Sequence, residues 1–218
     1  MQFKIMRVFI VSVMLVLFQF TSAFAQVKPV NKTDINPAAS NNNWAIGMFY
    51  SDNGFGLSGT FSSRLARTTD LNFKLSISGV TDNSEVEYYD YYGNSIIRGK
   101  ENRVFMSTLS IGLKHNIFFD DIEGNFKPLI KGGIAPTLIF FSPYSKTFFD
   151  SFKYAQTSYG LGVYGGVGIE YYESKSIGLG ITFEYYYIPV LGPDVYSLKD
   201  KKITNVGGVQ IGFTFMFL

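Results

Sequence analysis

The sequence predicts an all-β fold: an eight-stranded antiparallel up-and-down transmembrane β-barrel, preceded by a cleavable signal peptide. Three observations lead to this prediction. The N-terminal segment has the pattern of an export signal. From Trp44 onward, apolar and polar residues alternate with the two-residue period of strands. Finally, the strand charges that can be placed share one face with Gly, Ser and Thr, while the other face is apolar.

Residues 1–25 are predicted to be the signal peptide. Lys4 and Arg7 precede an uncharged apolar run from residue 8 to 18, and Ala23-Phe24-Ala25 has the small-residue pattern of a cleavage site. The run is shorter than the roughly 20 residues that a membrane-spanning helix needs. We therefore expect cleavage after Ala25 rather than an N-terminal membrane anchor.

Residues 26–42 are predicted to form a flexible periplasmic leader, because they are rich in Asn and Pro and have no periodicity. Without the signal, Lys plus Arg falls from 19 to 17 and equals the 17 Asp plus Glu, so the exported chain has no net charge. A nucleic-acid partner therefore has no electrostatic support. There is no cysteine, which excludes disulfides and a lipid-modified N-terminal Cys.

Residues 43–218 are predicted to form the barrel, and eight alternating runs account for it. Asn53-Gly54, between the first two runs, is a strong hairpin signal. The predicted strands are 43–51, 55–63, 71–80, 104–118, about 126–141, 157–172, 176–188 and the terminal run from Ile203.

The distribution of charge decides which face of these strands points outward. One face of the strands carries no charged residue, and in the third run its alternate positions are Leu71, Phe73, Leu75 and Ile77. The alternate positions on the opposite face carry too few charges for a surface in water, but their small polar residues suit a crowded interior. We therefore expect the apolar face to contact lipid. Charged side chains predicted to form a lumenal network are Lys74, Lys114, Lys131, Glu170 and Glu184.

The connections agree with a barrel in the bacterial outer membrane. Links after the second, fourth and sixth runs are short, whereas those after the third, fifth and seventh (about 81–103, 142–156 and 189–202) are long. Two aromatic girdles are expected at the membrane interfaces. The predicted girdle residues are Trp44, Phe61, Phe118, Phe126, Tyr171, Tyr172 and Phe217 at one end, and Tyr50, Phe140, Phe141, Tyr159, Tyr185 and Tyr187 at the other.

With these features, residues 43–218 resemble the small outer-membrane β-barrel families of the OmpA-barrel, OmpX and OmpW type, and the broad outer membrane protein β-barrel domain group. The resemblance rests on architecture and on the last strand, GGVQIGFTFMFL, which is similar to the aromatic-ended signal read by the outer-membrane assembly machinery. Its ladder is Val209, Ile211, Phe213, Phe215 and Phe217, followed by Leu218 in place of a terminal aromatic residue.

The resemblance implies a porin-like cell-envelope protein in the outer membrane of a Gram-negative cell. Outer-membrane lipid and the assembly machinery would be its partners. Eight strands enclose a space that side chains can fill, so an open diffusion pore is not expected. The lumenal charges are interpreted as a salt-bridged plug, and the alternative is a proton or anion path.

Enzymatic activity, metals and cofactors are not predicted. The single histidine, His115, lies on the lipid-facing parity without a serine beside it, so it offers no catalytic triad. The glycine-rich stretch 162–168 lies within a predicted strand and has no following helix to bind phosphate.

The long loops are the remaining candidates for function. Segments 81–103 and 142–156 concentrate Tyr, Phe and mixed charge, a composition found in recognition surfaces, although these rings could equally cover the barrel mouth. The predicted function is a non-enzymatic outer-membrane barrel, structural or binding an extracellular or envelope partner through its loops. The alternatives are a PorT-like accessory of envelope assembly or protein secretion, and a soluble ligand-binding barrel.

Overall fold

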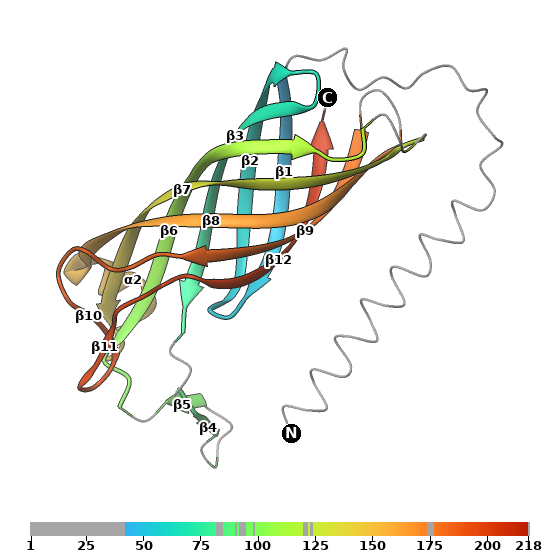
Figure 1. The fold of residues 1–218 in the computed structure, drawn as a ribbon. Helices are drawn as coiled ribbons and strands as arrows, with labels where there is room; N and C mark the ends of the chain where they lie inside the picture. The colour runs from blue at the N-terminus through green and yellow to red at the C-terminus, as the bar shows by residue number, and fades with distance from the viewer. Residues whose placement is uncertain are drawn as a thin grey trace. The chain divides into compact units, whose positions relative to one another are not determined.

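The computed structural model describes residues 42–81, 85–89, 91, 95–97, 99–119, 122, 124–173 and 177–217 (Figure 1). The predicted signal peptide, the leader up to residue 41 and Leu218 lie outside the described residues.

Eight strands close into a barrel, and each pairs antiparallel with its neighbours (Figure 1). The eight-stranded antiparallel fold predicted from alternation is therefore confirmed. The barrel strands are β1 (Asn42–Ser51), β2 (Gly54–Ala66), β3 (Thr69–Val80), β6 (Asn102–Asn116), β7 (Phe126–Pro143), β8 (Gln156–Tyr172), β9 (Ile177–Tyr187) and β12 (Gly208–Phe217).

The last strand closes the barrel against the first. β12 pairs with β1 from Trp44 opposite Phe217 to Ser51 opposite Gln210, and with β9 on its other side. Both of its edges are thus paired, as closure of a sheet requires.

The two ends of the barrel differ. At one end, which we call the turn end, the chain passes directly from β2 to β3, from β6 to β7 and from β8 to β9 (Figure 1). At the other, the loop end, β1 and β2 join through Asp52 and Asn53, with Gly54 at a φ of 119° that suits only glycine.

The loop end also carries three long connections that contain short elements of their own. Residues 81–101 include the hairpin of β4 (Glu87–Tyr89) and β5 (Ser95–Ile97). Residues 144–155 include α2 (Phe148–Ser151) and the 3-10 turn η2 (Phe152–Tyr154). Residues 188–207 include the hairpin of β10 (Val195–Leu198) and β11 (Lys201–Ile203).

Alternation along the strands separates an outward apolar face from a buried inward face. In β9, the outward residues Ile181 and Phe183 are about half exposed, while the inward Thr182 and Glu184 are buried. The same alternation runs along β3, where Leu75 is exposed and Lys74 is buried. In the described barrel, large apolar residues thus cover the outward face, and many of the polar residues face inward.

Three sequence predictions need correction. The terminal barrel strand begins at Gly208 and not at Ile203, which belongs to β11. The break lies at Asn205, whose side-chain oxygen accepts hydrogen bonds from the backbone N–H groups of Ile188 and Gly207. Tyr172 and Phe141, predicted as girdle residues, point inward and are buried.

Among the described residues, no helix is both long enough and apolar enough to span a membrane.

Candidate functional site

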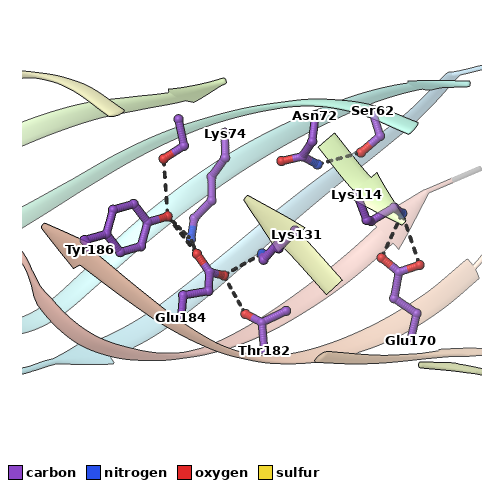
Figure 2. Close-up of polar contacts among 10 residues, drawn as sticks. Ser62, Asn72, Lys74, Lys114, Lys131, Glu170, Thr182, Glu184 and Tyr186 are labelled. Atoms are coloured by element: carbon purple, nitrogen blue, oxygen red, sulfur yellow. Dashed lines mark hydrogen bonds and ion pairs between the residues drawn. The ribbon is translucent and has the colours of Figure 1, made fainter. Parts of the chain in front are cut away.

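The middle of the lumen contains one carboxylate held between two lysines (Figure 2). Glu184 of β9 accepts from the Nζ of Lys74 at 3.0 Å and pairs with the Nζ of Lys131 at 2.5 Å. The hydroxyls of Tyr186 and Thr182 donate to the same carboxylate at 2.7 and 2.8 Å. We call Lys74, Lys131 and Glu184 the central triad.

A second cluster lies toward the turn end. Lys114 of β6 pairs with Glu170 at 2.9 Å and with Asp70 at 3.1 Å. Asp70 also pairs with Arg64 at 2.5 Å, and the hydroxyl of Tyr172 donates to Glu170 at 2.5 Å. We call Arg64, Asp70, Lys114 and Glu170 the lower cluster.

The strand register explains how these side chains meet. Asp70 lies directly opposite Lys114 on the neighbouring strand, so their side chains contact across one strand pair. Lys131 and Glu184 are two strands apart, and both lie opposite Gly166 of β8. A Cβ at Gly166 would come within 2.9 Å of the Glu184 side chain, so glycine at this position keeps the path between them open.

The loop-end half of the lumen contains a cluster of buried apolar side chains, which we call the apolar layer, together with buried serines such as Ser78, Ser142 and Ser158. Its buried side chains come from the strands and from the connection 188–207, whose Val195, Ile203 and Val206 fold into the barrel mouth. The rings of Tyr164 and Tyr186 stack with centroids 5.1 Å apart at the boundary with the central triad. The other members of this apolar layer are Val80, Val104, Met106, Ala135, Ile139, Phe141 and Ile188.

All five predicted lumenal charges point into the barrel, where they belong to two groups and not to one. Lys74, Lys131 and Glu184 form one group, and Lys114 and Glu170 belong to the other. Sequence reasoning missed Asp70, although its parity is that of Lys74 four residues later. It placed Tyr172 in a girdle, because a girdle and a lumen both accept tyrosine. It missed Tyr186, although its parity is that of Glu184 two residues earlier.

His115 lies outside these groups. Its side chain points outward, and its Nδ1 is 2.9 Å from the hydroxyl of Thr69. Within the described ranges, no group of three or more His, Asp or Glu side chains could hold a metal ion.

Small cavities between the described side chains include two in the lumen. One, of about 40 Å³, lies between the central triad and the lower cluster and is bordered by Lys131, Lys114, Glu170 and several hydroxyls. The other, of about 20 Å³, lies near the β1–β2 turn and is bordered by Gln210 and Tyr186. Since a water molecule needs roughly 10–15 Å³ of such space, both are water-sized rather than a continuous channel.

Polar contacts at the loop end tie the connections to one another. Lys100 pairs with Glu85 at 2.6 Å, and the hydroxyl of Ser197 donates to the same carboxylate. The guanidinium of Arg103 lies 4.6 Å from the centre of the Tyr144 ring and donates to the carbonyl of Lys146. The first and last long connections thus contact one another through one buried carboxylate.

Comparisons with known proteins agree on the fold. No protein-family model matches the chain, and no curated protein matches it. The chain is similar to the OprG outer membrane protein of Pseudomonas aeruginosa (TM-score 0.51, 12% identity, 82% of this chain and 95% of that one). It is also similar to the N-terminal β-barrel domain of OprF from the same organism (0.50, 13%, 82% and 97%).

A third solved structure, Neisserial surface protein A, matches with a TM-score of 0.47 at 13% identity, over 81% of this chain and 93% of that one. From the first two comparisons and the closed eight-stranded topology, the chain has the fold of the small outer-membrane β-barrels.

Proposed function

We propose that this chain is an integral outer-membrane protein with a filled lumen, which catalyses no reaction and acts through the connections at the loop end. Export by the predicted signal peptide, cleavage after Ala25 and reading of the β12 ladder by the assembly machinery belong to the same proposal.

The outward surface of the barrel carries this proposal. Every barrel strand exposes large apolar side chains outward, for example Ile46 on β1, Leu75 on β3 and Val167 on β8. Soluble monomers rarely expose apolar patches beyond a few hundred Å². Transmembrane barrels instead present an apolar band about 25 Å tall to lipid. On the described barrel strands, the outward side chains of the Lys, Arg, His, Asp and Glu types are Arg103, near the loop end of β6, and His115, near its turn end.

The filled lumen argues against a pore. From the turn end to the loop end, the lumen contains first the lower cluster, then the central triad and then the apolar layer. A solute would have to separate buried ion pairs and then cross an apolar region, and both steps are costly.

The loop end offers the surface that a partner could contact. Aromatic side chains there are strongly exposed, with Tyr91 at 98% and Phe149 at 83%. Aromatic residues supply much of the contact energy in protein interfaces. The Lys100–Glu85–Ser197 contacts hold these parts of the first and last connections together, which lowers the cost of ordering them on binding.

Cell fractionation combined with gel mobility tests the proposal. We expect the protein in the outer-membrane fraction and, after folding in detergent, a faster-running band that boiling converts to a slower one. A soluble periplasmic protein whose boiled and unboiled samples run alike would contradict it. Deletion of the gene separates the roles: loss of exported proteins would indicate a secretion accessory, whereas an unchanged exported proteome favours a surface role.

A further inference from the structure

The lumen holds more positive than negative charge. Among the ion-paired side chains of its described part, four are cationic, Arg64, Lys74, Lys114 and Lys131, and three are carboxylates, Asp70, Glu170 and Glu184. Lys127, which has the same parity on β7 as Lys131, lies over the Phe119 ring at the turn end. The lower cluster is balanced, with two cations and two carboxylates. The excess therefore lies in the central triad, where two lysines share Glu184. An unbalanced charge in a buried site is costly unless a counter-ion is present.

Of the two lysines in the central triad, Lys131 has fewer polar partners for its ammonium group. Lys74 contacts both Glu184 and the Tyr186 hydroxyl, at 3.0 and 3.3 Å. For Lys131, Glu184 is the one ion-pair partner within the described chain, although an ammonium group has three N–H donors. Lys131 also borders the 40 Å³ cavity, which Lys74 does not.

The cavity wall beside Lys131 carries polar groups suited to an anion. Hydroxyls of Thr60, Ser62 and Thr214 border it, and a hydroxyl can donate a hydrogen bond. The Thr182 hydroxyl also borders it but donates to Glu184. Asn43 also borders it, is 8% exposed, and has a side-chain oxygen without a hydrogen-bond partner. Turning that amide over would direct its N–H₂ group to this position, since the two ends of an amide are interchangeable in shape.

We propose that the cavity between the central triad and the lower cluster binds a monovalent halide ion, held by Lys131 and the neighbouring hydroxyls. One negative charge balances the excess of the triad. Glu170 borders the same cavity and would repel an anion, but it is neutralised by Lys114 and bonded to Tyr172, so the ion is placed toward Lys131. This site concerns the lumen and is independent of what the loops bind.

Two measurements test the site. In crystals of the refolded barrel grown with sodium bromide, we expect anomalous scattering from bromide in this cavity, within bonding distance of the Lys131 Nζ. In solution, the temperature that converts the folded gel band to the unfolded one should rise saturably with chloride or bromide. Gluconate at the same ionic strength, which is too large to enter, should not raise it.

Variants separate the site from general salt effects. Lys131→Met leaves Lys74 and Glu184 as a matched pair, so its midpoint should be the same in halide and gluconate. Lys153→Met, at a side chain 77% exposed, should keep the wild-type dependence. An identical wild-type midpoint in the two salts, or a cavity without bromide, overturns the proposal even if Lys131→Met fails to fold. Absence of any heat-modifiable band would instead count against the barrel function proposed above.

Discussion

Glu184 is the residue on which the lumenal electrostatics depend most. Its side chain is fully buried and receives hydrogen bonds or ion pairs from Lys74, Lys131, Thr182 and Tyr186 (Figure 2). Each of its oxygens therefore has two partners. Removing this carboxylate leaves two lysines buried and like-charged, whereas removing one lysine leaves a balanced pair.

We predict that Glu184→Gln lowers the free energy of unfolding by roughly 3–5 kcal/mol, the usual cost of leaving a buried ion without its partner. Lys131→Met should cost clearly less. Urea unfolding of the refolded barrel in micelles, followed by the fluorescence of the single tryptophan, Trp44, measures both. Equal losses for the two variants would show that the shared carboxylate is not the key group.

Two glycines of β2 provide a second comparison at the same scale. Gly56 faces inward beneath the buried ring of Phe49, and a Cβ there would lie 2.2 Å from the ring's Cζ. Gly59 faces outward, where a Cβ would have no atom within 4 Å. We predict that Gly56→Ala destabilises the barrel by about 1–3 kcal/mol through overpacking, and that Gly59→Ala has little effect. The same urea titration decides, and a loss for Gly59→Ala as large as that for Gly56→Ala would contradict this account.

At the residue scale, the sequence could predict the face of a side chain but not its partner. Parity placed Lys74, Lys114, Lys131, Glu170 and Glu184 inside, because alternation fixes the face of each strand position. Pairing depends on the register between strands, and here also on Gly166, which leaves room for Lys131 to reach Glu184. Neither can be read from one strand alone.

At the scale of elements, the barrel strands were predicted closely where alternation runs through their whole length. β9 was expected at 176–188 and spans Ile177–Tyr187. The error at Ile203 has a physical cause, since β10 and β11 also pair and bury alternate residues, Val195, Ser197 and Ile203, in the barrel mouth. Local alternation cannot distinguish a short hairpin packed inside a barrel from a strand of its wall.

The ladder of β12 allows a test of depth in the membrane. Phe213 lies opposite Met48 and Ile181 in the middle of the apolar band, whereas Phe217 lies opposite Trp44 and Ile177 at the turn end. In a transmembrane barrel, an arginine facing lipid costs about 2–4 kcal/mol at the midplane and about 0–1 kcal/mol near an interface. Phe213→Arg should therefore destabilise the barrel in lipid vesicles much more than Phe217→Arg does. Urea unfolding in vesicles measures the difference, and equal effects would argue against this placement.

For the whole molecule, the lumen combines two kinds of layer, ion-paired clusters and a cluster of apolar side chains. The sequence predicted a polar plug, and the lower cluster and central triad have the composition expected for it. The apolar layer on their loop-end side could not be predicted, because near the loop ends of β6 and β7 both faces of the strands carry apolar residues. Phe105 and Phe140 face outward, while Met106 and Ile139 face inward. Only closure of the barrel and the return of residues 188–207 decide which side chains become interior.

The succession of these layers along the lumen leads to a prediction about conductance. We expect no steady conductance from the refolded protein in planar bilayers, and none from Lys114→Ser, which removes the cation that joins Asp70 to Glu170. In that variant an ion would still meet the central triad and then the apolar layer, where Val104 is 4% exposed and Ile139 is fully buried. An ion that crosses such a layer loses its hydrating water and gains no polar contacts in exchange.

A general porin in the same bilayers is the positive control. Steady openings of the wild type would show that the layers separate readily, and openings of Lys114→Ser alone would place the whole barrier in the lower cluster.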